Sequence, residues 1–125
     1  MKIIPFTKRT VFGTFKPILW HSKAKEEIST FPEDVKRDLG YLLYLLQIGE
    51  GLSMPHSRPM RTVGSGVAEL RVRGKDSHYR AFYLQKTNAG ILVFHAFVKK
   101  TQATAMIDIN LGRKRLSELL EDLDG

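Results

Sequence analysis

Cysteine is absent from this sequence of 125 residues. Its absence excludes disulfide frameworks, thiolate zinc sites and cysteine nucleophiles. Apolar runs long enough for a membrane span, roughly 18 to 20 residues, are absent too, and the N-terminal residues lack the continuous apolar stretch of a signal peptide. We therefore expect a soluble, cytoplasmic protein without a membrane partner.

Metal-binding and nucleotide-binding signatures are also missing. His21, His56 and His78 lie in unrelated contexts without metal-ligand spacing. Residues 64–66, Gly-Ser-Gly, lack the third glycine of a dinucleotide-binding loop, and the pattern after them is that of a strand rather than a helix. We therefore expect neither a metal ion nor an organic cofactor.

Acidic side chains are too few to balance the basic ones. The chain carries 20 Lys and Arg against 13 Asp and Glu, a formal charge of +7, and 42% of its residues are hydrophobic. The length and apolar content fit one compact domain, and the charge favours polyanionic partners such as nucleic acid, ribosomes or acidic proteins. The excess is concentrated in residues 54–100, which carry nine basic and two acidic side chains.

The N-terminal segment shows no sustained periodicity. Residues 1–18 contain two prolines, so we interpret them as an irregular or strand-like arm that precedes a single domain of residues 19–125. The aromatic side chains of Phe6, Phe12 and Phe15 are expected to pack locally within this arm.

Two helices are predicted next. Ser22 is a suitable N-cap for a helix that runs to about Thr30, and Pro32 stands at a first-turn position of a second helix. The second helix has one apolar stripe, made of Val35, Leu39, Leu42, Leu43 and Leu46. Gly49 is placed to cap its C-terminal end. Together the two segments predict a helical hairpin.

The second half of the chain changes to a strand pattern. Residues 50–66 are rich in Gly and Pro and predict a loop. Residues 68–73 then alternate between apolar and charged side chains, and segments 79–86 and 91–98 predict two further strands after short turns. The three strands predict an antiparallel meander.

A C-terminal helix completes the predicted fold. Residues 108–123 have an amphipathic pattern, although Gly112 lowers the helix stability by about 1 kcal/mol relative to Ala. The order of elements indicates the α+β class, in which an N-terminal helical hairpin and a C-terminal helix pack on a small antiparallel sheet.

Arginines are spaced to share one face of the first predicted strand. Arg71 and Arg73 are two residues apart, so their side chains would leave the same face about 6 to 7 Å apart along the backbone, a separation suited to neighbouring phosphates. Arg80 follows the turn and can reach the same region. Alternatively, the arginines are simply the solvated side of a half-buried strand, and the pattern gives both interpretations roughly equal weight.

The third predicted strand ends in Lys99 and Lys100. Alternation places His95 on a face that also carries Ile91, Val93, Phe97 and Lys99. His95 and Lys99 would then share a surface with the arginines. Against this, a histidine inside an apolar string is more often a core residue with a satisfied hydrogen bond, and a terminal lysine pair is typical of a solubilising strand end.

Closely spaced cations could cleave RNA without a metal. That reaction requires activation of the ribose 2′-hydroxyl, neutralisation of charge on the phosphate and protonation of the departing 5′ oxygen. Arg suits bidentate phosphate contact, whereas Lys acts as a base only where neighbouring cations or burial lower its pKa. His95 is an alternative proton carrier, since the ordinary pKa of histidine lies near neutrality.

Several segments, taken in order, carry a family resemblance. They are Trp20 with Ser22; Phe31-Pro32 with Val35, Gly40 and Leu43; Gln47-Ile48-Gly49; and the segments 66–71, 79–83 and 95–101. From Pro17 to about Leu123 the chain resembles the phage-derived, HigB-like branch of the RelE/ParE toxin superfamily. The most specific segment is the strand end His-Ala-Phe-x-Lys-Lys, downstream of Glu-Leu-Arg and Tyr-Arg-Ala.

The resemblance implies a RelE-like fold and the toxin of a type II toxin–antitoxin system. Such a toxin is a metal-independent endoribonuclease, an mRNA interferase that cleaves messenger RNA in the ribosomal decoding site and inhibits translation. The positions that match its phosphate-binding and proton-transfer residues are Arg71, Arg80, Lys99 and Lys100. His95 is a further catalytic candidate, and the basic region adds the RNA-binding candidates Arg58, Arg61, Arg73 and Lys75.

An antitoxin partner is also implied, typically a helix-turn-helix protein. A basic face is a natural docking surface for an acidic or amphipathic segment of such a partner.

The chain departs from the family pattern near its C-terminus. Thr104-Ala105 stands in place of a common Thr-Pro, Gly112 replaces a common Ala, and no Tyr follows Lys100. Two alternatives to a ribonuclease therefore stay open. One is a non-enzymatic inhibitor that binds a protein target such as DNA gyrase, as in the ParE branch, and the other is a phage-derived binding module without toxicity.

Overall fold

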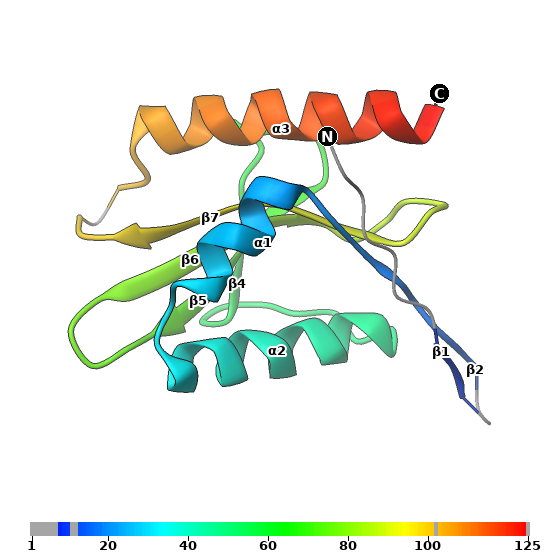
Figure 1. Ribbon diagram of the computed structural model, residues 1–125, viewed down its shortest axis with the longest axis horizontal. Coiled ribbons are helices and arrows are strands. Elements are labelled where there is room, and N and C mark those ends of the chain that lie inside the picture. Colours follow the sequence, from blue (N-terminus) through cyan, green and yellow to red (C-terminus); the bar gives the residue numbers. More distant parts are fainter. Residues whose placement is uncertain (1–7, 11–12, 102, 125) are drawn as a thin grey trace.

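The chain folds into a five-stranded sheet and three helices, with a separate pair of short strands near its N-terminus (Figure 1). The computed structural model describes residues 8–10, 13–101 and 103–124. The elements are β1 (Lys8–Thr10), β2 (Gly13–Phe15), β3 (Ile18–Trp20), α1 (Ser22–Ser29), α2 (Glu33–Gln47), β4 (Ser57–Pro59), β5 (Val67–Arg73), β6 (His78–Leu84), β7 (Ile91–Lys99) and α3 (Met106–Asp124). The predicted mixture of helices and strands is confirmed.

The strand order in the large sheet is β3-β7-β6-β5-β4. Strands β5, β6 and β7 form the predicted antiparallel meander, and β4 pairs antiparallel to β5. β3 instead runs parallel to β7, with Ile18 opposite Ile91. The prediction of a purely antiparallel sheet is therefore wrong at this edge, where the long connection between β3 and β7 permits a parallel pairing.

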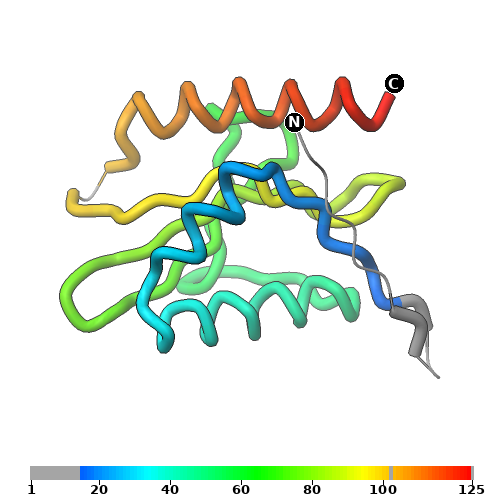
Figure 2. Tube along the Cα trace, viewed as in Figure 1, coloured from blue at the N-terminus to red at the C-terminus, as the bar shows by residue number. Residues whose placement is uncertain are grey.

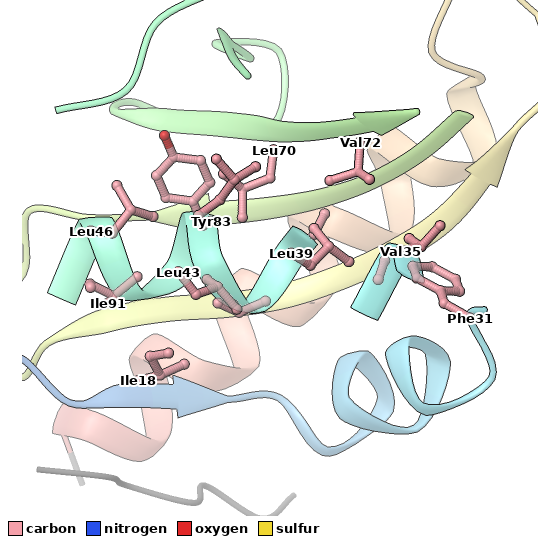
Figure 3. Packing of buried hydrophobic residues seen from close by; sticks show 14 residues of the cluster. Ile18, Phe31, Val35, Leu39, Leu43, Leu46, Leu70, Val72, Tyr83 and Ile91 are labelled. Atoms are coloured by element: carbon pink, nitrogen blue, oxygen red, sulfur yellow. The ribbon is translucent and has the colours of Figure 1, made fainter. Parts of the chain in front are cut away.

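Helices α2 and α3 cover opposite faces of the large sheet (Figures 1 and 2). The apolar stripe of α2 packs on side chains that β5, β6 and β7 direct to that side, as Figure 3 shows for Leu39, Leu43, Leu70, Tyr83 and Ile91. The apolar side chains of α3 pack on a second cluster that includes Val67, Phe82, Leu92 and Phe94. The sheet thus has an α2 side and an α3 side.

Helix α1 lies along the edge of β7, beyond the end of β3. The backbone N–H of His21 donates to the carbonyl of Val93 at 2.9 Å, and the N–H of Ala96 donates to Oε1 of Glu27 at 3.1 Å. These bonds occupy backbone groups that an exposed strand edge would leave unpaired. Helices α1 and α2 therefore pack on an edge and on a face, rather than together as the predicted hairpin.

The helix ends follow local capping chemistry. The ring Nδ1 of His21 accepts from the N–H of Lys23 at 3.1 Å, so the N-cap of α1 is His21 and not the predicted Ser22. Two acidic residues in the first turn of α2 suit the positive end of its dipole. Gly49 follows α2 with φ of +94°, a conformation that glycine adopts without strain.

Two short strands of the large sheet lie outside the three strand segments predicted from the sequence. Ile18, assigned to the N-terminal arm, is the first residue of β3 and is buried. Residues 57–59, within the predicted loop of residues 50–66, form β4. Both strands have three residues, too few for an alternation to be recognised.

The N-terminal arm is described in part. β1 and β2 pair antiparallel, with Lys8 opposite Phe15. Phe15 is buried and its ring centroid lies 5.8 Å from that of Tyr44 on α2. Phe6 and Phe12, which were expected to pack within the arm, lie outside the described residues.

A bulge in β7 decides which of its side chains face α3. The register pairs Phe82 with His95, but the next residue of β6 pairs with Val93, so Phe94 is an extra residue. The prediction that Ile91 and Val93 share the face of His95 is therefore wrong, and both pack toward α2. After the bulge, His95 and alternate residues up to the end of the strand point to the α3 side.

Gly112 allows α3 to approach the sheet closely. A Cβ atom at this position would lie 2.7 Å from Cδ2 of Phe82. The glycine that weakens the helix in isolation is thus the residue on which the aromatic ring of β6 packs.

Candidate nucleic-acid interface

Basic side chains from four adjacent strands meet on the α3 side of the sheet. In the strand register Arg71 lies opposite Arg80, and His78 lies opposite Lys99. We define the cationic cluster as Arg58, Arg71, Arg73, Arg80 and Lys99. Directly opposite residues have Cβ atoms about 4.5 to 5.5 Å apart, a spacing at which like charges destabilise a sheet.

The cationic cluster occupies the part of this face that α3 does not cover. The same strands place apolar side chains under α3, which are Val67, Phe82, Leu84, Leu92 and Phe94. In Figure 1 the turn between β5 and β6 projects past the N-terminal end of α3. The strands are therefore apolar under the helix and cationic beyond it.

The cluster has a buried centre and an exposed rim. Arg80 and Lys99 are 4% and 5% exposed, whereas Arg58 and Arg73 are exposed and Arg71 is intermediate. A polyanion that contacts the rim would lie directly above the two buried cations.

Glu69 is the acidic residue at the centre of the cluster, and its side chain is fully buried. It lies opposite Arg58 in the register, and its Oε1 is 3.4 Å from Nε of Arg80. Its Oε2 accepts a hydrogen bond of 3.1 Å from the hydroxyl of Thr104, in the loop before α3. Glu69 is thus the carboxylate within the cluster, and its closest cationic partner is Arg80.

Several buried polar atoms of the cluster have no hydrogen-bond partner among the described residues. They are Nζ of Lys99, Nε of Arg71, Nε of Arg80 and Oε1 of Glu69. A buried donor or acceptor without a partner costs about 1 to 3 kcal/mol, and more where it is charged. The cluster therefore contains cationic donors whose hydrogen-bonding capacity is unused among the described residues.

Electrostatics in the cluster favour loss of positive charge. Burial lowers the pKa of Lys99, and Glu69 opposes this shift while Arg80, Arg71 and Arg58 add to it. Burial likewise lowers the pKa of Arg80, again with Glu69 opposing. Lys99 is therefore held in the setting in which an amine can act as a base.

His78 senses the same positive field from the exposed rim. Loss of surrounding water lowers its pKa, and the charges of Arg80 and Arg73 lower it further. His78 was not predicted as a site residue, since its place opposite Lys99 depends on strand register.

His95 lies in the core and not in the cationic cluster. Its side chain is 2% exposed, and its Nε2 is 2.8 Å from Oδ1 of Asp108. Its Nδ1 is 2.9 Å from Nη1 of Arg115, which also donates to Glu27 at 2.7 Å. Since a guanidinium only donates, Nδ1 of His95 accepts and the Nε2–H donates to Asp108. We call these four residues the His95 network.

This geometry favours the structural interpretation of His95. Both ring nitrogens are engaged by residues of α3, and burial lowers the pKa of His95 although the bond to Asp108 opposes the shift. A ring without a free nitrogen has no lone pair or proton for a substrate. The His95 network connects β7 with α1 and α3.

The remaining sequence candidates are exposed and lie around the cluster. Lys75 is in the turn between β5 and β6, and Lys100 follows the end of β7. Arg61 lies in the connection between β4 and β5, where it lines a cavity of about 1140 Å³ together with Ser57 and Tyr83. This cavity opens beside β4, so Arg61 is separated from the centre of the cluster.

Glu69 and Thr104 are site residues that sequence reasoning missed. Glu69 shares its strand face with Arg71 and Arg73, and that alternation was the available signal. Its complete burial depends on the loop that carries Thr104, which no local pattern indicates.

No group of three or more His, Asp or Glu side chains in the described part of the chain could hold a metal ion. In that described part, no helix has both the length and the apolar character that a membrane span requires.

Comparison with known protein families shows which family the chain belongs to. Residues 26–117 match the family described as "Phage derived protein Gp49-like (DUF891)". The chain belongs to this Gp49-like family. The match includes every residue of the cationic cluster, and it confirms the phage-derived part of the resemblance. No match was found among curated proteins.

Proposed function

We propose that this Gp49-like protein is the toxin of a type II toxin–antitoxin system, in the HigB-like branch of the RelE superfamily. Its activity is metal-independent cleavage of messenger RNA on the ribosome, in the cytoplasm. The observation that carries the proposal is the cationic cluster, in which the buried Nζ of Lys99 and the Nε atoms of Arg71 and Arg80 have no hydrogen-bond partner among the described residues.

The exposed rim would bind the RNA backbone. Arg58, Arg71 and Arg73 come from two adjacent strands and can contact successive phosphates, and Lys75 and Lys100 extend the basic surface on either side. Arg61 would contact RNA that continues past β4. These contacts position the chain without reading its sequence.

The buried centre would perform the chemistry. Lys99, in its neutral form, takes the proton of the ribose 2′-hydroxyl, and the 2′ oxygen forms a bond to phosphorus. Arg80, together with Arg71 opposite it in the strand register, stabilises the negative charge on the phosphate oxygens. The bond to the 5′ oxygen breaks, and that oxygen takes a proton from solvent at the exposed rim. The products are a 2′,3′-cyclic phosphate and a 5′-hydroxyl. His95 has no part in this step.

Expression of the wild-type chain with mapping of RNA 5′ ends tests the proposal. We expect growth arrest and new 5′-hydroxyl ends in messages under translation. Lys99→Met should lose both effects, whereas Lys25→Met, which removes an exposed lysine of α1 outside the cluster, should keep them. Equal toxicity of the two variants would contradict the proposed site.

The same experiment separates the alternatives. DNA breaks without new RNA ends would indicate a gyrase inhibitor, and absence of growth arrest would indicate a binding module without toxicity. Either result excludes the ribonuclease.

An antitoxin of the helix-turn-helix type is part of the proposal. The cationic cluster forms a surface that an acidic segment of a partner can neutralise. Coexpression with the product of the adjacent reading frame should restore growth. If no neighbouring product restores it, the proposed partner is wrong.

A further inference from the structure

Glu69 is a buried carboxylate in a region where the other charged side chains are cationic. Burial of an ionised carboxylate is unfavourable unless cations and donors compensate for lost water. An amide or an apolar side chain would fill the same space on β5 without that requirement. We therefore ask how the negative charge of Glu69 affects its cationic neighbours Arg80 and Lys99.

The contacts of Glu69 fix its two oxygens differently. Oε2 accepts from Thr104 at 3.1 Å, which ties the carboxylate to the loop before α3. Oε1 lies 3.4 Å from Nε of Arg80 and has no hydrogen bond among the described residues. The carboxylate is thus held from behind by Thr104 and presents Oε1 to the cationic cluster.

Lys99 lies near charges from the three strands on one side of β7. Arg58 on β4, Arg71 on β5 and Arg80 on β6 favour its neutral form, and His78 faces it across the β6–β7 pair. Glu69 favours its protonated form. Glu69 is thus the charge that opposes the arginines at the amine.

We propose that Glu69 is a positioning residue of the candidate ribonuclease site. It orients the guanidinium of Arg80 and sets the pH range over which the Lys99 amine exchanges its proton. The role in cleavage rests on the proposed function, whereas the electrostatic role concerns the folded chain alone.

The first test is a titration of the Lys99 amine by NMR in the full chain. In Glu69→Gln the midpoint for Lys99 should move to lower pH, because the arginines then act unopposed. The exposed Lys100 amine is an internal reference that should move less. Glu121→Gln, which removes an exposed carboxylate of α3, is the charge-matched control and should leave Lys99 unchanged.

The second test is the pH profile of message cleavage. In Glu69→Gln the ascending limb should move to lower pH together with the Lys99 midpoint. The maximal rate should fall by about tenfold or more, since misplacement of a reacting group by 1 Å can lower rates by about 100-fold. Glu69→Asp keeps the charge but shortens the side chain, so it should restore the midpoint while the rate stays low.

The outcomes distinguish the two proposals. A shifted Lys99 midpoint in a chain that cleaves no message supports the electrostatic role of Glu69 and overturns the ribonuclease. An unchanged midpoint in folded Glu69→Gln overturns the role of Glu69, whatever the activity. Should Glu69→Gln fail to fold, the carboxyl carbon of Glu69 in the wild type decides the matter: an ionised group at neutral pH supports the role, and a protonated group overturns it.

Discussion

Two polar groups on the α3 side of the sheet differ in how completely the hydrogen-bonding atoms of their buried members are paired. In the His95 network both ring nitrogens of His95 are engaged, and Arg115 also pairs with Glu27. In the cationic cluster Lys99 and the Nε atoms of Arg71 and Arg80 have no hydrogen-bond partner among the described residues. His95 and Lys99 are both residues of β7. The two groups therefore differ in the partners of these residues and not in the strand that carries them.

This difference indicates a structural role for the His95 network and a role in activity for the cationic cluster. A fully satisfied buried network holds elements in place, and the His95 network joins α1, β7 and α3. A cluster of unsatisfied like charges lowers stability and is retained where a ligand supplies the missing partners. We therefore expect substitutions in the first group to affect folding and those in the second to affect activity.

Arg71→Ala should produce the largest effect. Loss of one preorganised donor at a reacting phosphate lowers rates by about 100-fold to 1000-fold, so message cleavage in a translation extract should fall by this factor. Arg71 lies opposite another cation, so its removal should leave the unfolding transition nearly unchanged. Cleavage within threefold of wild type would remove Arg71 from the site.

His95→Ala should show the reverse pattern. The substitution removes two hydrogen bonds and a ring that packs 5.1 Å from the centroid of Phe97. We expect the free energy of unfolding to fall by roughly 2 to 4 kcal/mol in urea titrations. Cleavage, normalised to the folded fraction, should not change, and a selective loss of cleavage would return His95 to the chemistry.

Sulfate binding should distinguish the two groups. An anion that binds only the folded state at 100 times its Kd stabilises it by about 2.7 kcal/mol. We expect sulfate to raise the Tm of the wild type by several degrees more than chloride of equal ionic strength. The increase should be smaller in Arg71→Ala and unchanged in His95→Ala, and an equal rise in all three would indicate a general salt effect.

Acidification should produce the smallest effect, a decrease in the free energy of unfolding that arises from the His95 network. Burial lowers the pKa of His95 from 6.5, so the unfolded chain binds the proton first as pH falls. The contribution of His95 to stability is therefore complete above pH 6.5 and is lost progressively below it. The free energy of unfolding should fall less steeply below this pH in His95→Gln than in the wild type, and parallel slopes would contradict the assignment.

The sequence predicted the long elements because their periodicity is set by one dominant neighbour. The leucine stripe of α2 and the alternation of β5 each reflect packing on a single surface. Such patterns are visible without knowledge of the partner. Three-residue strands such as β3 and β4 depend on pairing with distant segments, so they were missed.

The candidate site was predicted in part for the same reason. Alternation put Arg71 and Arg73 on one face, and the structure places Arg80 and Lys99 beside them. The bulge at Phe94 could not be predicted, since an extra residue is recognised only from the register of β6 and β7. The buried state of Glu69 likewise depends on the loop that carries Thr104.

The most direct test of the account is the stability of two methionine variants measured side by side. Lys99→Met removes an unsatisfied buried amine and its repulsion from the arginines, so the free energy of unfolding should rise by about 1 kcal/mol. Arg115→Met leaves Nδ1 of His95 without its donor and removes the ion-pair partner of Glu27, whose Oε1 keeps the N–H of Ala96. The free energy of unfolding should therefore fall by roughly 2 kcal/mol. Opposite signs are the predicted result, and destabilisation by both variants would contradict it.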